Sequence, residues 1–193
     1  MVGRSTGCGY VAVRRSARVS LHEVDVYLAV ASKREVRDYD GRPLGEEAER
    51  RILEAGRVAG SSKNRQARRF VVVRDDALRD EVAESVYASD NVRGAALVVA
   101  VVVGGKGPTS FDAGRAAQNM MLAASSDGIG SCPNGVADAG RLQAAIGHGD
   151  DERVASVLTF GYPARPRHPE RRSPEEWIAA ADRKPYEEIV EER

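Results

Sequence analysis

The apolar run "AALVVAVVV", from Ala95 to Val103, constrains the fold of this chain more than any other feature. It is about half of the roughly 20 residues that a helix needs to cross a bilayer. A short valine-rich run without a polar face is typical of a β-strand that is buried on both sides. We therefore predict that this run is a strand in the middle of a sheet, not at its edge.

Patterns on either side of the run predict further helices and strands. Residues 45–60 begin with acidic side chains and end at Gly60, which is typical of an amphipathic helix. Helices are also predicted at 75–89, 138–147 and 173–183, the last with a capping box, and strands at 69–74 and 153–163. Residues from 24 onward form a short helical or extended opening segment. This irregular alternation leaves α/β and α+β folds both open.

Residues 112–128 have an unusual helical pattern. Asp112 is the expected N-cap, Gly128 the expected stop, and small or soft apolar residues occur on almost every face. A helix that is apolar all round is buried. With so few bulky side chains, we expect it to pack closely against another helix or another subunit.

Length and charge restrict the class of protein. The chain has 193 residues, with 29 Lys and Arg against 29 Asp and Glu, so it carries no net charge that would attract nucleic acid or a membrane surface. We expect one domain at 25–193 after a disordered arm at 1–24. Two cysteines, Cys8 and Cys132, make a disulfide framework improbable and favour a cytoplasmic location.

A cluster of cations follows the opening segment. Lys33, Arg34 and Arg37 lie in "SKREVRDY", where Arg can offer a planar fork to a phosphate and Lys a point charge. The alternative is a solvated charged surface. A similar string, "RRSAR" in the arm, has no predicted element around it and is not interpreted as a site.

Polar side chains are concentrated in "GSSKNRQARRFVVVR", between a helix and a strand. Ser62, Asn64 and Gln66 occupy alternate positions and could point the same way, offering neutral donors and acceptors to a ligand rich in carbonyl groups and ring nitrogens. The alternative is an ordinary solvated loop.

The stretch "GSCPNGVAD", residues 130–138, is predicted to be a loop whose backbone amides can hydrogen-bond a flat ring. Cys132 has no His near it in sequence, so we do not expect a nucleophile there. The three histidines are scattered without partners at ligand spacing, so no metal site is expected.

Five motifs in order, "SKREVRDY", "GSSKNRQARRFVVV", "DAGRAAQNMMLAASSDGIGSCPNG", "LTFGYP" and "RKPYEEIV", resemble the nitroreductase family of flavin enzymes over roughly residues 26–190. The resemblance implies an α+β fold with a mostly antiparallel sheet flanked by helices. It also implies an intertwined homodimer that holds two FMN molecules at the subunit interface, with residues 112–128 central in the dimer.

The resemblance also implies a set of FMN contacts. Lys33, Arg34 and Arg37 would hold the phosphate and the polar edge of the flavin, although Glu35 stands where many relatives have Ser. Ser62, Asn64 and Gln66 match the family's polar segment, with Ala67 in place of its usual Pro. The remaining expected contacts are Pro133, Asn134 and Gly135 over one flavin face and Arg183 near the phosphate.

The implied activity is transfer of hydride from NAD(P)H through FMN to a nitroaromatic, a quinone or a similar small-molecule acceptor. No obvious acid, base or nucleophile is present, as expected where the cofactor carries the chemistry, so no catalytic residue is assigned. Acceptor choice would lie in segments such as 87–94 and 163–177. The alternatives are a flavin or deazaflavin binder that is not reduced, and a specialised family reaction such as flavin destruction or dehalogenation.

Overall fold

The structure is a computed structural model that describes residues 25–147 and 149–193. The arm predicted to be disordered, residues 1–24, lies outside the described residues. The element order mixes helices and strands, and every strand pair is antiparallel. The chain therefore has an α+β fold, and the α/β alternative is excluded.

The sheet has four strands in the order β1-β2-β4-β3. The strands are β1 (Arg68–Val73), β2 (Leu97–Gly104), β3 (Gly130–Asn134) and β4 (Glu152–Gly161). The valine run forms β2, which pairs with β1 on one side and β4 on the other. Seven of its eight residues are buried, as predicted for a strand inside a sheet.

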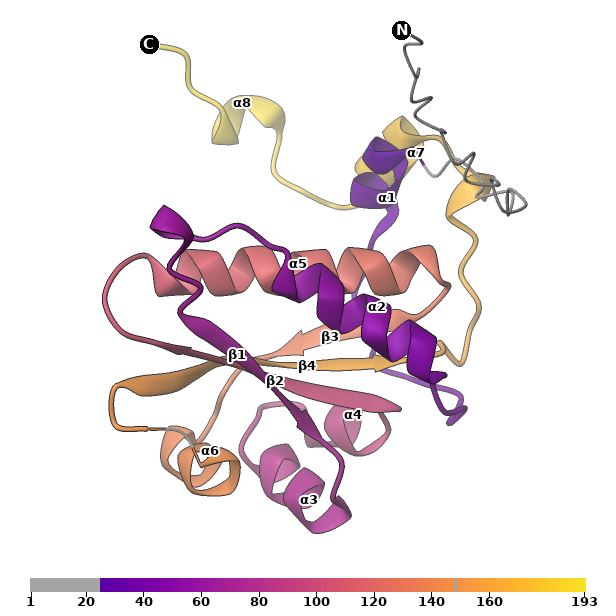
Figure 1. The fold of residues 1–193 in the computed structure, drawn as a ribbon. Helices are drawn as coiled ribbons and strands as arrows, with labels where there is room; N and C mark the ends of the chain where they lie inside the picture. Colours follow the sequence, from indigo (N-terminus) through magenta and orange to yellow (C-terminus); the bar gives the residue numbers. More distant parts are fainter. Residues whose placement is uncertain (1–24, 148) are drawn as a thin grey trace, which may run out of the picture.

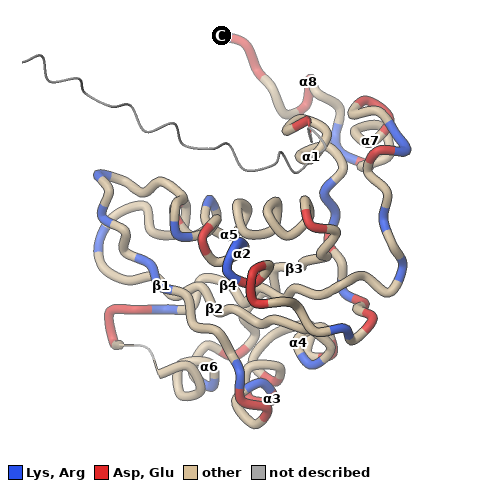
Figure 2. Tube along the Cα trace, turned by 45° about the vertical axis from the view of Figure 1, so that its right-hand side comes forward, with Lys and Arg blue, Asp and Glu red and all other residues tan. Residues whose placement is uncertain are grey.

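The helices cover both faces of the sheet (Figure 1). Helices α2 (Glu46–Arg57) and α5 (Thr109–Ser126) lie on one face, and α3 (Asp76–Glu84), α4 (Ser89–Arg93) and α6 (Ala139–Ile146) lie on the other. Val99 and Val101 of β2 belong to the first core, whereas Val98 belongs to the second. This alternation along one strand explains why β2 is apolar at every position. Figure 2 shows β2 without a charged residue.

Short helices at the two ends of the described chain lie apart from these layers (Figure 1). They are α1 (Val26–Ser32), α7 (Pro174–Ala179) and α8 (Tyr186–Ile189), and two 3₁₀ turns occur at Ser62–Asn64 and Pro169–Arg171. The capping box predicted at Ser173 and Glu176 is present in α7. None of the described helices is long and apolar enough to cross a membrane.

Helix α5 starts earlier than predicted but packs as predicted. It begins at Thr109 instead of after Asp112, so Asp112 lies in its first turn. It packs closely on α2, where a methyl group on Gly56 would lie only 2.6 Å from Met120 Cε. None of the described residues of the same chain covers its opposite face, where Phe111 is 67% exposed.

The segment 130–138 was predicted to be a loop, but Gly130–Asn134 form the edge strand β3. Its proline does not break the sheet, because an edge strand has one side without ladder hydrogen bonds and Pro133 needs no partner there. The sequence pattern failed because the strand is short and contains Gly and Pro, which normally indicate turns.

Candidate functional site

The basic segment after α1 crosses the sheet at a pair of glycines. Gly130 of β3 pairs with Gly161 of β4. A methyl group on Gly130 would lie 2.7 Å from Val36 Cβ, and one on Gly161 would lie 2.8 Å from Tyr39 Cγ. The Val36 amide donates to the Ser131 carbonyl at 3.0 Å. These two glycines therefore let the segment that carries Lys33, Arg34 and Arg37 lie directly on the sheet.

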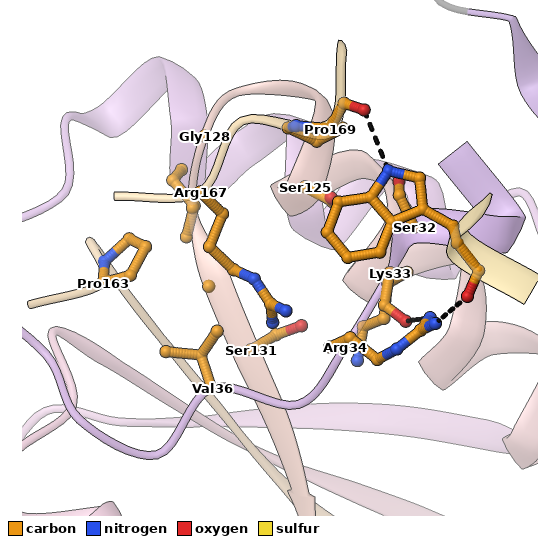
Figure 3. Close-up of a pocket in the computed structure, with 13 residues that line it drawn as sticks. Ser32, Lys33, Arg34, Val36, Ser125, Gly128, Ser131, Pro163, Arg167 and Pro169 are labelled. Carbon is orange, nitrogen blue, oxygen red and sulfur yellow. Dashed lines mark hydrogen bonds between the residues drawn. The ribbon is translucent and has the colours of Figure 1, made fainter. Parts of the chain in front are cut away.

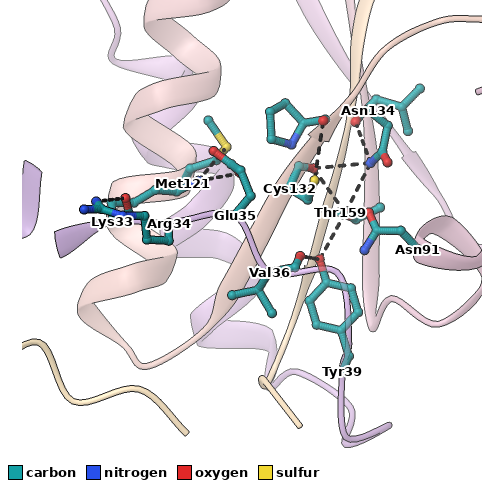
Figure 4. A network of polar contacts seen from close by, with 12 residues as sticks. Lys33, Arg34, Glu35, Val36, Tyr39, Asn91, Met121, Cys132, Asn134 and Thr159 are labelled. Atoms are coloured by element: carbon teal, nitrogen blue, oxygen red, sulfur yellow. Dashed lines mark hydrogen bonds and ion pairs between the residues drawn. The ribbon is translucent and has the colours of Figure 1, made fainter. Parts of the chain in front are cut away.

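A buried polar network fixes the backbone of this segment (Figure 4). The Thr159 hydroxyl donates to Asn91 Oδ1 at 2.6 Å, and Asn91 Nδ2 donates to the Arg37 carbonyl at 3.2 Å. The Tyr39 hydroxyl donates to the Val36 carbonyl at 2.8 Å and lies 3.1 Å from Thr159 Oγ1. Burial raises the pKa of Tyr39, so the phenol stays protonated near neutral pH.

Lys33 and Glu35 neutralise each other within the segment. Lys33 Nζ lies 2.7 Å from Glu35 Oε2 and 3.5 Å from Met121 Sδ of α5. The Lys33 side chain is only 6% exposed, whereas that of Glu35 is 37% exposed. The carboxylate at the position where many relatives have Ser thus pairs with the first cation of the motif.

Arg37 is exposed, and the positive charge of its guanidinium group lowers the pKa of the Cys132 thiol. Burial raises the pKa of Cys132, and the charge of Arg37 opposes this shift in part. A buried thiol with a raised pKa is a poor nucleophile at neutral pH.

The polar stretch after α2 has a strained backbone. Lys63, Asn64 and Gln66 have φ values of 51°, 52° and 53°, a region that disfavours side chains other than Gly. Such strain costs on the order of 1 kcal/mol per residue and concentrates at functional sites. The loop is held by Asp112 Oδ2, which accepts from the Ser62 amide at 3.1 Å. Asn64 is exposed, and its side chain makes no hydrogen bond within the described residues.

The two groups of predicted residues do not meet within one chain. Lys33 contacts Met121, whereas Ser62 contacts Asp112. These two α5 residues are separated by roughly 13 Å of helix at about 1.5 Å per residue. The basic segment and the polar loop thus lie toward opposite ends of α5.

The other predicted contacts are placed as follows. Asn134 is buried, and its Nδ2 donates to the carbonyls of Cys132 and Val157 at 3.3 and 3.2 Å, so its amide nitrogen is used inside the sheet. Pro133 and Gly135 are exposed beside it. Arg183 is exposed and donates to the Ala181 carbonyl at 2.7 Å.

One cation near the basic segment was not singled out from the sequence. Arg167 lies in the connection after β4 and lines a cavity together with Arg34 (Figure 3). Arg167 could not be identified as a site residue from the sequence, because no motif spacing relates it to Arg34. Among the described residues, no group of three His, Cys, Asp or Glu side chains could hold a metal ion.

Comparisons with known proteins agree with this architecture. A family model described as "Putative TM nitroreductase" matches residues 25–193. A curated relative from Archaeoglobus fulgidus, named "Putative NADH dehydrogenase/NAD(P)H nitroreductase", is 29% identical over 144 residues, which cover 69% of this chain and 83% of the relative.

Solved structures share the fold. A protein from Desulfovibrio desulfuricans, described as a "putative nitroreductase in complex with FMN", has a TM-score of 0.71 and 27% identity, covering 87% of this chain and 96% of the other. A nitroreductase family protein from Clostridium difficile has a TM-score of 0.72 and 21% identity, with coverages of 86% and 96%. Because the family model matches residues 25–193 and so spans every described residue, this chain belongs to the nitroreductase family.

Proposed function

We propose that this protein is an FMN-dependent oxidoreductase that passes hydride from NAD(P)H through FMN to a nitroaromatic, a quinone or a similar acceptor, with residues 25–193 as a single domain. The observation that carries the proposal is the family match over those residues, which includes both the basic segment and the strained polar loop. The FMN complex of the Desulfovibrio desulfuricans protein supports the cofactor. A Vibrio harveyi NADPH:FMN oxidoreductase, solved with NAD⁺ and 24% identical, has the same fold.

The residues of the polar loop fit a flavin. Asn64 is exposed and has a free amide, which can both donate to and accept from the polar edge of an isoalloxazine ring. The strained backbone of Lys63, Asn64 and Gln66 lowers stability, and such strain is typical of functional sites, so we infer that the shape of this loop serves ligand binding. We assign Ser62, Asn64 and Gln66 to the flavin on this basis.

The basic segment fits a phosphate through Arg37 and, less well, through Lys33. Arg37 is exposed and has no carboxylate partner within the described residues. Lys33 already pairs with Glu35, so a phosphate would meet a carboxylate beside it. We therefore assign Arg37 as the principal phosphate contact of this segment and Lys33 as a secondary one. Arg34 and Arg183 remain proposed contacts of the phosphate, as the resemblance implies.

We propose that the active form is a homodimer. The polar loop and the basic segment lie at opposite ends of α5, and the outer face of that helix exposes Phe111 and Arg115. A second copy packed on this face would bury the apolar surface and bring a polar loop toward a basic segment across the interface. Such a pocket is incomplete in one chain and complete in two.

FMN, when bound, supplies the acceptance and donation of hydride. Asn64 and the exposed backbone near Gly135 would orient the ring, and their hydrogen bonds would stabilise negative charge on its polar edge. Burial raises the pKa of Cys132, and we assign no chemical role to its thiol.

The first experiment is the visible absorption spectrum of the purified protein, followed by addition of NADPH and then NADH without oxygen. A yellow protein that loses its colour with either donor would support the proposal. A yellow protein that keeps its colour with both donors and with reduced deazaflavin would favour a flavin-binding protein without reductase activity. A colourless protein that takes up no FMN would refute the cofactor assignment.

A further inference from the structure

The hydroxyl group of Thr159, in β4, lies between the two segments that we assign to the cofactor (Figure 4). One is the basic segment, where Arg37 is the proposed phosphate contact. The other is the edge of the sheet at Gly135, whose backbone is proposed to face the flavin ring. Thr159 is 0% exposed, so its hydroxyl group cannot reach a ligand directly and can act only through its neighbours.

On one side, this hydroxyl group holds the basic segment. Thr159 Oγ1 donates to Asn91 Oδ1 at 2.6 Å, and Asn91 Nδ2 donates to the Arg37 carbonyl at 3.2 Å. The Tyr39 hydroxyl lies 3.1 Å from the same Oγ1 atom and donates to the Val36 carbonyl at 2.8 Å. Two consecutive carbonyl groups of the basic segment are therefore held by partners that both contact Thr159.

On the other side, the same hydroxyl group holds the end of the edge strand β3. Asn134 Nδ2 lies 3.3 Å from Thr159 Oγ1 and 3.2 Å from the Val157 carbonyl. Asn134 is 3% exposed, and its Oδ1 atom makes no hydrogen bond within the described residues, so the side chain is oriented through Nδ2 alone. Thr159 Oγ1 also lies 3.1 Å from the carbonyl of Cys132, the residue opposite it in the strand pair.

The peptide bond between Asn134 and Gly135 takes its orientation from this arrangement. The Asn134 carbonyl accepts from the hydroxyl group of Ser156 in β4 at 3.3 Å. Because the carbonyl and the N–H of a trans peptide point in opposite directions, the Gly135 N–H points away from β4. Gly135 is exposed, so this N–H is open to a ligand beside the edge of the sheet.

We propose that Thr159 is a positioning residue of the flavin site, whose hydroxyl group holds the Arg37 segment and the Gly135 amide in one rigid frame. This inference rests on the proposed function. In the low dielectric of the interior, the hydrogen bonds of such a network strengthen one another, and loss of one member leaves its neighbours unpaired. Without the hydroxyl group, Asn91 Oδ1 would lose its donor and Asn134 Nδ2 one of its acceptors.

Two substitutions separate the hydroxyl group from the space that the side chain fills. Thr159→Val keeps the β-branched shape without the hydroxyl group, whereas Thr159→Ser keeps the hydroxyl group and loses a methyl group. Val73→Ala is the control for lost packing, since Val73 is buried in β1 at the opposite edge of the sheet. The dissociation constant of FMN should rise at least tenfold in Thr159→Val and less than threefold in the other two variants.

Riboflavin and the midpoint potential test the flavin-ring end of the frame. Riboflavin lacks the phosphate, and Thr159→Val should weaken its binding at least threefold. The midpoint potential of bound FMN should fall by about 30 mV in Thr159→Val, since tenfold weaker binding of reduced than of oxidised flavin corresponds to that shift for two electrons. A role in stability alone would leave the potential unchanged, and Thr159→Ser and Val73→Ala should keep the wild-type potential.

Three results would overturn the proposal: an FMN affinity of Thr159→Val within threefold of wild type, an unchanged potential in that variant, or a loss as large in Thr159→Ser as in Thr159→Val. If Thr159→Val does not fold, Tyr39→Phe replaces it, because it removes only the hydroxyl group that lies between Thr159 and the Val36 carbonyl. This variant should bind FMN at least threefold more weakly, and an affinity within twofold of wild type would also overturn the proposal.

Failure of this inference and failure of the proposed function give different results. A wild-type protein that binds no FMN would refute both. A wild-type protein that binds and reduces FMN, together with a Thr159→Val variant that matches it, would refute the role of Thr159 alone.

Discussion

Lys33 Nζ lies 2.7 Å from Glu35 Oε2, so an ion pair occupies the segment that we assign to the phosphate of FMN. The pair has a consequence for cofactor affinity. A carboxylate beside a doubly charged phosphate repels it and also occupies the lysine that would otherwise bind it.

Replacing Glu35 by Ser should therefore strengthen FMN binding about tenfold, which corresponds to about 1.4 kcal/mol. The measurement is the dissociation constant of FMN, by fluorescence quenching of the flavin. Glu54→Ser is the control, because Glu54 pairs with Arg57 on the exposed side of α2. An unchanged constant for Glu35→Ser would show that the phosphate does not lie beside Lys33.

Two substitutions of Asn64 separate the effect of its backbone conformation on stability from the effect of its side-chain amide on FMN affinity. Asn64→Ala removes the amide and also places Ala at a φ of 52°, which costs about 1 kcal/mol of stability, whereas Asn64→Gly removes the amide and relieves the strain. We expect both variants to bind FMN about tenfold more weakly, as for loss of a hydrogen bond of about 1.4 kcal/mol. Only Asn64→Ala should also lose thermal stability. FMN affinity within twofold of wild type in Asn64→Gly would remove Asn64 from the site.

Gly130→Ala tests whether the glycine pair positions the basic segment. The added methyl group would lie 2.7 Å from Cβ of Val36, a stiff β-branched side chain that cannot turn away. We expect the free energy of unfolding to fall by about 1–3 kcal/mol and FMN binding to weaken. Chemical denaturation measures the first and fluorescence titration the second.

The control for this variant is Gly140→Ala in α6, where the nearest atom, Asp138 Oδ1, would be 3.6 Å from the methyl group. Alanine favours helix over glycine, so this variant should gain about 0.5–1 kcal/mol. Equal effects of the two substitutions would contradict the close approach of Val36.

Phe111 tests the homodimer. It is 67% exposed on the outer face of α5, with the Arg115 guanidinium 5.8 Å from its ring centre. Phe111→Glu places a charge in the proposed interface and should shift the protein to monomers that lose FMN together with the second subunit. Sedimentation velocity and the flavin content after gel filtration measure both effects. Phe111→Leu should remain dimeric, and a Phe111→Glu protein that stays dimeric with full FMN would place the interface elsewhere.

Stability should depend on pH through Cys132 and Tyr39. Burial raises the pKa of both groups, so the folded protein holds their protons more tightly than the unfolded chain does. The contribution of each group to the free energy of unfolding is fully present below its pKa in the unfolded chain, about 8.5 for the thiol and about 10 for the phenol. It is lost as the pH rises through the higher pKa of the folded state. The free energy of unfolding should therefore decline above about pH 8.5.

Cys132→Ala isolates the thiol in this pH dependence. The variant should show a shallower decline between about pH 8.5 and pH 10 than wild type, because only Tyr39 then contributes. Urea denaturation at a series of pH values measures the slope of the free energy of unfolding against pH. The smaller side chain of Ala also lowers this free energy, but by the same amount at every pH, so the slope is unaffected. Identical slopes would mean that Cys132 titrates alike in the folded and unfolded states.

Local sequence patterns predicted the structure correctly where the conformation of an element depends only on its own residues. The apolar run 95–103 could only be a doubly covered strand, and it forms β2 between two neighbours. The capping box predicted in residues 173–183 forms between Ser173 and Glu176. Each of these features depends on residues within a few positions of one another, so the sequence records it directly.

Local patterns failed where a long-range partner decides the outcome. The glycine and proline of "GSCPN" indicated a loop, yet pairing with β4 makes it the edge strand β3. Asp112 was expected to cap its own helix, but its carboxylate accepts from the amide of Ser62. In both cases a tertiary contact overrides the local preference.

By itself the sequence predicted five of the described helices, α2, α3, α5, α6 and α7, and three of the four strands, together with the resemblance to the nitroreductases and the residue types of a flavin site; it did not predict the short helices α4 and α8. Only the tertiary structure decided that Lys33 and Asn64 lie toward opposite ends of α5, that Glu35 neutralises Lys33, and that Arg167 joins Arg34 at a cavity. The physical reason is that periodicity and capping act over a few residues, whereas distances between side chains far apart in the chain depend on how the whole sheet and its helices pack.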